Sequence, residues 1–230
     1  MEQIRVCTYD GPGAAPVIRT VPWPKIPRKA ALLKVGACGV CGTDLHILRG
    51  HWPKALPWPF TLGHEIGGVI VEAGSEFTED FMSKPLGVGS KVMIPPLMPC
   101  GHCYYCVHYP ESANKCLTPV YYRRYLGFDK APHLWGGWAE YVYVDLDMLP
   151  GTKIYKLPDD MSLRLGALSE PCCVCIGGRP DPLSRETENP KQKKYPSKRT
   201  SPKKCLVNFP CGLMDEIEAA AANDKGEQGS

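Results

Sequence analysis

The sequence has few of the features that would assign it at once to a membrane, secreted or nucleic-acid-binding class. No run approaches the roughly 20 apolar residues of a membrane-spanning helix. The N-terminus shows no basic head followed by an apolar core, which would indicate a signal peptide. The net charge of +3 gives no argument for nucleic-acid binding. We therefore expect a cytoplasmic protein without a membrane partner.

The composition is that of a globular protein. Hydrophobic residues make up 43% of the 230 residues and charged residues 22%, which is typical of a chain with an apolar core. The length suits one or two domains. Cysteine, in contrast, is abundant, with 12 residues. Without a signal peptide, metal binding explains this number better than disulfide bonds do.

Short alternating or β-branched segments, separated by glycine and proline, predict a mostly β (α+β) domain of barrel type. A helix starting near Thr43 or Asp44, with either residue as its cap, is expected to reach Leu48, and a second helix is expected to start within Ser162–Leu168. Strands are expected at Ile4–Tyr9, Val17–Val21, Ala30–Ala37, Ile66–Val71 and Ile154–Leu157. Gly87–Ile94 is expected to be a turn followed by a strand, and Gly136–Val144 to be a strand entered through a glycine turn.

Two motifs together indicate a catalytic metal site. The first is Cys41-Gly-Thr-Asp-Leu-His46, and the second is Gly63-His64-Glu65. They contain a thiolate, imidazoles and carboxylates, a set of ligands that suits Zn²⁺. A zinc ion with three protein ligands and an open position lowers the pKa of a bound oxygen, so the pair of motifs predicts catalysis.

A cysteine-rich loop predicts a second, structural metal site. Cys100, Cys103 and Cys106 follow one another at two-residue spacing, and Cys116 comes after a short loop. Four thiolates can close a tetrahedral zinc site. The ligand type also permits an iron–sulfur cluster, disulfide bonds are a further alternative, and His102 could replace one cysteine.

With these motifs the chain resembles the zinc-containing medium-chain dehydrogenase/reductase family, which includes alcohol, sorbitol and threonine dehydrogenases. The resemblance implies a GroES-like β-barrel catalytic domain over residues 1–178, with a structural zinc lobe at 95–120, and it favours zinc over iron–sulfur. The matching stretches are CGVCGTDLH (38–46), GHEIGGVIVEAG (63–74), the four-cysteine loop (100–116), GGWAEY (136–141) and LSEP (168–171).

The resemblance also implies the ligands of the catalytic zinc. Cys41 and His64 are expected to bind the metal, and Glu65 and Glu170 to complete its coordination directly or through water. Asp44 is expected to hold the ring of His64 in one tautomer. As alternatives, Glu65 could pair with a cation, and Glu170 could be an exposed helix residue.

The same family resemblance assigns the proton transfer to Thr43 and His46. Thr43 is expected to hydrogen-bond the substrate oxygen and His46 to form the outer end of a proton relay, although Thr43 could also serve only as a helix cap. Other cysteines and histidines are expected to have no ligand role. These are Cys38 as a core residue, Cys172, Cys173 and Cys175 as apolar filler, and His51, His108 and His133 at the surface.

By resemblance, the activity is the oxidation of a small alcohol or polyol with NAD(P), by a protein that can form oligomers. No Gly-x-Gly-x-x-Gly fingerprint follows a strand, and about 60 residues after Glu170 are too few for a complete Rossmann domain. Residues 179–230 are basic and proline-rich, which predicts a disordered tail. We therefore expect a truncated, inactive form. The alternatives are a non-catalytic zinc domain and, with less support, a zinc module that binds nucleic acid.

Overall fold

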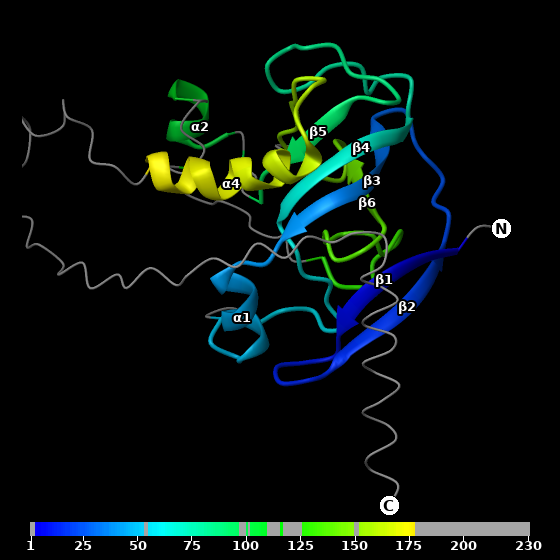
Figure 1. Ribbon diagram of the computed structural model, residues 1–230, viewed down its shortest axis with the longest axis vertical. Helices are drawn as coiled ribbons and strands as arrows, with labels where there is room; N and C mark the ends of the chain where they lie inside the picture. The colour runs from blue at the N-terminus through cyan, green and yellow to red at the C-terminus, as the bar shows by residue number, and fades with distance from the viewer. Residues whose placement is uncertain are drawn as a thin grey trace, which may run out of the picture.

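A computed structural model describes residues 3–52, 55–96, 100, 102–109, 116, 126–149 and 152–177, the last four by their backbone only. This part of the chain contains two antiparallel sheets (Figure 1). The smaller sheet pairs β1 (Gln3–Tyr9) with β2 (Pro16–Pro22). The larger sheet has the order β6 (Tyr141–Asp145), β3 (Ala30–Gly39), β4 (Glu65–Ala73), β5 (Lys91–Ile94) and β7 (Tyr155–Lys156).

Backbone hydrogen bonds join β1 of the smaller sheet to two connecting segments of the domain. Cys7 N–H donates to the Trp138 carbonyl over 2.9 Å, and Tyr9 and Phe60 exchange two bonds of 3.0 and 2.9 Å. Between the sheets lies an apolar core that includes Leu33 and Ile70, both fully buried. The expected mostly β domain is thereby confirmed.

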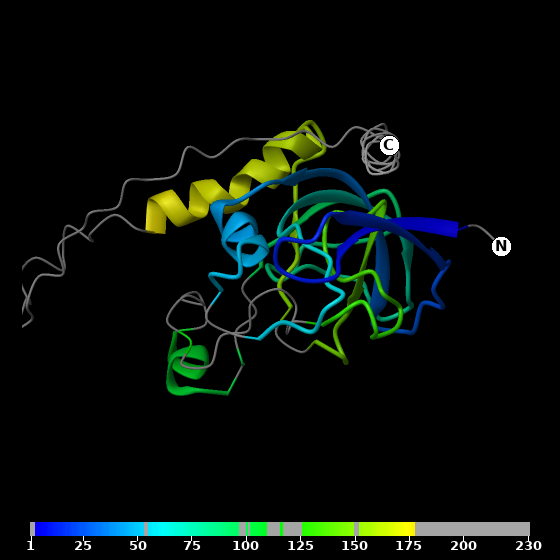
Figure 2. The same cartoon turned by 90° about the horizontal axis from the view of Figure 1, so that it is seen from below.

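Helix α4 (Leu163–Gly177) packs on the larger sheet across β3 and β4 (Figures 1 and 2). Glycine on the strands allows this close approach. A Cβ atom at Gly67 would lie 2.3 Å from the Leu163 carbonyl oxygen, and one at Gly36 would lie 2.1 Å from Leu163 Cδ1. The repeated glycines in these strands therefore have a packing role.

The expectation that Cys172 and Cys173 are apolar filler is wrong, because both lie exposed on helix α4, which starts within the expected segment and continues well beyond Leu168. The strand expected after the glycine turn at Gly136 begins at Tyr141, because the backbone before it hydrogen-bonds to the loop preceding β4. The short helix α2 (Tyr104–His108) had no recognised signal in the sequence.

Some expectations fall on parts of the chain outside the described residues. The predicted tail, residues 179–230, is one of them, and Cys175 has no described side chain. Within the described part of the chain, no helix combines the length and apolar character needed to span a membrane.

Candidate metal centres

The first candidate centre forms where β3 ends and helix α1 (Gly42–Leu48) begins. Cys41 is the N-cap of this helix, with an extended backbone at φ −100° and ψ 156°. Its N–H donates to Asp44 Oδ2 over 2.7 Å. The expectation that Thr43 or Asp44 is the cap itself is therefore wrong, because the helix starts one residue before Thr43. Asp44 contributes to the cap from the third helical position.

Three potential ligands meet at this point. One ligand atom each from Cys41, His64 and Glu65 lies within 4.8 Å of the other two. His64 immediately precedes β4, and Glu65 is the first residue of that strand. Both side chains are buried, with 8% and 3% of their surface exposed. The pairing of β3 with β4 thus brings together Cys41 and His64, which are 23 positions apart in the sequence.

Asp44 connects two members of this cluster. Its carboxylate is fully buried, and Oδ1 lies 3.4 Å from His64 Nδ1, while Oδ2 accepts the Cys41 N–H. A carboxylate that holds one ring nitrogen of a histidine leaves the other nitrogen for a metal and fixes the tautomer. Asp44 contacts His64 as the expected role requires, and the role itself stays a prediction.

The electrostatics of the cluster favour a metal-binding thiolate. Burial raises the pKa of the Cys41 thiol, but hydrogen bonds with His64 and Thr43 outweigh burial and hold this pKa below its usual value. Burial lowers the pKa of His64, whereas its bonds to Asp44 and Cys41 raise it to about 10. The thiolate is the form of cysteine that binds metals.

Three further residues named from the sequence, Glu170, Thr43 and His46, do not belong to this cluster of three ligands. Glu170 is buried on α4, with 9% exposed, so the interpretation as an exposed helix residue is wrong. It does not belong to the group of three ligand atoms found among the described residues. Thr43 Oγ1 lies 3.6 Å from Cys41 Sγ. His46 is exposed on α1, and its ring centroid is 6.1 Å from that of His51.

The histidines and the cysteine expected to have no ligand role are placed as follows. Cys38 is 1% exposed and belongs to the apolar core. His51 and His108 are exposed. His133 is half-buried, and its Nδ1 is 2.5 Å from the Phe128 carbonyl oxygen.

Sequence reasoning gave no role to Gly63, which precedes His64. Gly63 has a φ of +89°, in the region that favours glycine. A Cβ atom here would lie 2.5 Å from Trp138 Cδ1 and 2.8 Å from Cys38 Sγ. The glycine next to His64 in the motif was the available signal, and its role is to let the chain turn tightly before the ligand.

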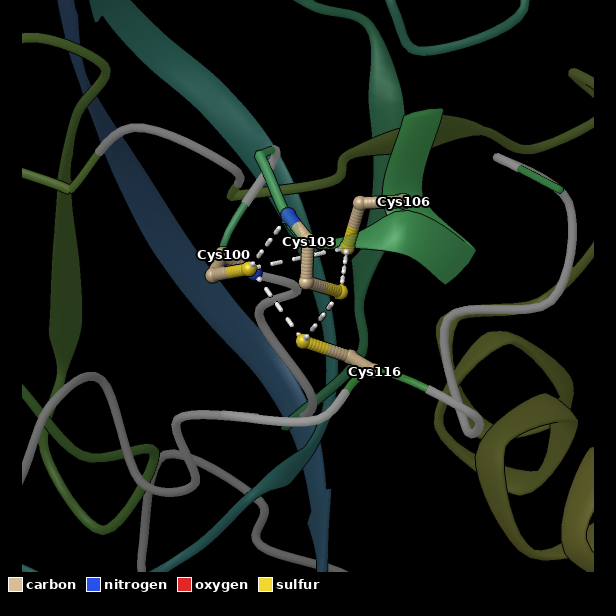
Figure 3. A group of neighbouring side chains, drawn as sticks. All are labelled: Cys100, Cys103, Cys106 and Cys116. Carbon is tan, nitrogen blue, oxygen red and sulfur yellow. Dashed lines mark hydrogen bonds between the residues drawn. The ribbon is translucent and has the colours of Figure 1, made fainter. Parts of the chain in front are cut away.

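The four cysteines of the loop form the second candidate centre (Figure 3). Cys100 Sγ lies 3.8 Å from Cys106 Sγ, and Cys103 Sγ lies 3.5 Å from Cys106 Sγ and 4.0 Å from Cys116 Sγ. A tetrahedral zinc site with Zn–S bonds of about 2.3 Å requires sulfur–sulfur distances of about 3.8 Å. A disulfide would need about 2.05 Å, so the disulfide alternative is wrong. The four sulfur atoms fit zinc.

Backbone groups support the same arrangement of sulfur atoms. The N–H of Cys100 donates to Cys116 Sγ, and the N–H of Cys103 donates to Cys100 Sγ, each over 3.3 Å. Such bonds stabilise the negative charge of thiolates. His102 is exposed, and its Nδ1 is 2.9 Å from the Cys100 carbonyl oxygen. The group of four ligands consists of the cysteines and does not include His102.

Comparison with known proteins gives a consistent result. The model of the alcohol dehydrogenase GroES-like domain matches residues 27–159, more than half of the chain. An alcohol dehydrogenase of Geobacillus stearothermophilus is 36% identical over 65% of this chain and 39% of its own length. The scyllo-inosose 3-dehydrogenase of Thermotoga maritima is 34% identical over 68% of this chain and 40% of its own length. The chain thus spans about two fifths of these relatives.

Solved structures show the same similarity. A crystal structure of an alcohol dehydrogenase from Thermotoga maritima superimposes with a TM-score of 0.64 and 26% identity, over 74% of this chain and 45% of that one. A zinc-binding dehydrogenase from Sinorhizobium meliloti, bound to NADP, superimposes with a TM-score of 0.58 and 30% identity. That match covers 76% of this chain and 44% of the other.

Proposed function

The chain belongs to the family of the alcohol dehydrogenase GroES-like domain, and we propose that it is the zinc-binding catalytic domain of an oxidoreductase that acts on a small alcohol or polyol with NAD(P). The product would be an aldehyde or a ketone. The observation that supports this most directly is the cluster of Cys41, His64 and Glu65, whose ligand atoms lie within 4.8 Å of one another. The names of the relatives, an alcohol dehydrogenase and a scyllo-inosose dehydrogenase, agree with that class of substrate.

The proposal includes two zinc ions per chain. One would be held by Cys41, His64 and Glu65, with buried Glu170 completing the coordination directly or through water. The other would be held by the four cysteines of the lobe, whose sulfur spacing suits a tetrahedral site. Both sites require reduced thiols, which supports a reducing compartment such as the cytoplasm.

In the proposed mechanism the chain's own residues orient the substrate and move its proton. A zinc ion held by the cluster would supply a Lewis acid that lowers the pKa of an alcohol hydroxyl. Thr43, 3.6 Å from Cys41 Sγ, would accept a hydrogen bond from the alcohol hydroxyl and relay the proton by giving up its own hydroxyl proton, while the hydride on the alcohol carbon would go to NAD(P)⁺. Exposed His46, one helical turn further along α1, would pass that proton to solvent. Asp44 would keep His64 in the tautomer that binds.

A non-catalytic zinc-binding domain is the second candidate function. The sequence contains no glycine-rich fingerprint for a pyrophosphate, and the chain spans about two fifths of its relatives. No residue of the chain is assigned to NAD(P).

Metal analysis of the purified chain tests the proposed sites. We expect about two zinc ions per chain, of which Cys41→Ser removes one and Cys103→Ser the other. Cys173→Ser is a suitable control, since Cys173 is an exposed thiol outside both clusters. A chain without zinc, or one whose zinc content survives both substitutions, would contradict the proposal.

A further inference from the structure

Gly39 lies directly opposite a proposed metal ligand. It is the last residue of β3, and its partner in the strand register is Glu65, the first residue of β4. Side chains of opposed residues share one face of a sheet and compete for the same space. A Cβ atom at Gly39 would lie 2.0 Å from Glu65 Oε2 and 3.0 Å from Glu65 Cδ. The carboxylate therefore occupies the volume that a side chain at position 39 would fill.

We propose that Gly39 is a positioning residue, because its missing side chain allows the Glu65 carboxylate to fold over β3 into the metal centre. This inference rests on the proposed function, since it concerns the metal held by Cys41 and His64. Glu65 is 3% exposed, so its carboxylate has no access to water that could compensate for burial. Its direction is set by the space at Gly39.

Replacing Gly39 with alanine would force the carboxylate to move. A contact of 2.0 Å is far inside van der Waals distance, and the register of β3 and β4 keeps the two backbones in place. The side chain of Glu65 can relieve the clash by rotating, which takes its oxygen away from Cys41 and His64. The site would then keep its thiolate and imidazole and lose its carboxylate.

Gly36 provides a matched control on the same strand. A Cβ atom at Gly36 would meet Leu163 Cδ1 at 2.1 Å, a clash as close as that at Gly39. Leu163 is the first residue of α4 and not a ligand. Gly36→Ala therefore imposes a comparable steric cost on β3 without reaching Glu65. A role of Gly39 in folding alone would make the two substitutions equivalent.

The test uses the whole chain with Co²⁺ in place of zinc. We expect Gly39→Ala to weaken metal binding at one centre by about 10- to 100-fold, measured against a competing chelator. This centre is the one whose metal binding Cys41→Ser abolishes. The visible absorption of the bound Co²⁺ should change as well. Gly36→Ala should alter neither property. In a Glu65→Gly background, where residue 65 has no side chain, Gly39→Ala should weaken binding no further.

The possible outcomes separate the two proposals. Unchanged binding in Gly39→Ala, equal losses in Gly36→Ala, or additive losses with Glu65→Gly would overturn the role of Gly39 and leave the proposed function intact. A Cβ atom at Gly39 would also lie 3.0 Å from Glu65 Cβ, so Glu65→Gly is the substitution that removes the whole contact. If Gly39→Ala does not fold, its combination with Glu65→Gly must fold and bind like Glu65→Gly alone, or the inference is wrong. A wild-type chain with no metal sensitive to Cys41→Ser would overturn both.

Discussion

At the scale of single residues, Asp44 is the side chain that organises the candidate catalytic centre. Its fully buried carboxylate accepts the N–H of Cys41 and lies 3.4 Å from His64 Nδ1. A buried charge of this kind is retained only where partners compensate for its lost hydration. Asp44 therefore fixes two potential ligands at once, and the arrangement of the centre depends on its charge as well as its shape.

Asp44→Asn should weaken metal binding at this centre by about 10- to 100-fold, since asparagine keeps the shape and removes the charge that holds His64. The measurement is competition with a chelator at constant pH. Asp129→Asn, at an exposed carboxylate, is the control. Zinc in the four-cysteine lobe should be unaffected by either change. Equal affinity in the Asp44 variant and the wild type would show that Asp44 does not support the ligands.

At the scale of secondary-structure elements, Asp80 links the β4–β5 connection to the short strand β7. Asp80 Oδ1 accepts the N–H groups of Met82 and Lys84, and Oδ2 accepts the N–H of Lys156 in β7, each over 2.8 Å. Strand β7 has two residues and pairs with β5. One carboxylate thus attaches an edge strand to the rest of the sheet.

The stability contributed by Asp80 should depend on pH. Burial raises the pKa of Asp80, but the N–H groups of Lys156, Lys84 and Met82 together hold it below the ordinary value of 3.8. Because the folded-state pKa is lower than the unfolded-state pKa, this stability is present above the ordinary value. It is lost as the pH falls through the folded-state pKa.

Asp80→Asn should therefore lower the free energy of unfolding at pH 7 by about 1–3 kcal/mol, and the difference from the wild type should shrink as the pH falls toward 3. Urea unfolding at several pH values measures it. Asp160→Asn, at an exposed position, is the comparison. A difference that stays constant with pH would mean that the charge of Asp80 is not responsible.

At the scale of the whole molecule, the two candidate metal centres belong to separate parts of the fold. One lies beside α1, where the interior strand β3 of the larger sheet ends and its neighbour β4 begins, whereas α2, in the four-cysteine loop, lies away from both sheets (Figures 1 and 2). Loss of one metal is therefore expected to leave the other centre in place. Residues 27–159 match the alcohol dehydrogenase GroES-like domain, and the chain spans about two fifths of its relatives.

We expect the 230-residue chain alone to bind zinc but to show negligible NAD(P)-dependent turnover. Proximity and orientation can contribute about 7–11 kcal/mol of barrier lowering, and this chain has no fingerprint with which to hold the cofactor. Without a bound cofactor to exclude water, electrostatic stabilisation at the metal would also be weaker. The assay is NAD(P)H formation with primary, secondary and polyol alcohols. A longer chain with a nucleotide-binding domain should be active.

The same assay can also contradict the expected lack of turnover. Robust turnover by this chain, abolished by Cys41→Ser, would show that the cluster is catalytic without a separate nucleotide-binding domain. Turnover that survives Cys41→Ser would instead point to a contaminating enzyme, and would leave the expected lack of activity standing.

Much of the fold and the choice of candidate residues could be predicted from local patterns. Runs such as Ile66–Val71 form strands because β-branched side chains suit a pleated surface. The two-residue spacing of Cys100, Cys103 and Cys106 brings their sulfur atoms close within a short stretch of chain. The metal roles of these residues and of Cys41 remain predictions, but their proximity follows from spacing and from strands that the sequence identifies.

Only the tertiary structure decided how distant residues meet. The contact between Asp44 and His64, the direction of Glu65 over Gly39 and the burial of Glu170 depend on the register of β3 and β4 and on the packing of α4. Periodicity and spacing describe neighbours along the chain, whereas register and packing are set by the balance of many contacts between segments far apart in sequence. For this reason the ligand types were evident from the residues, while the geometry that orients them was not.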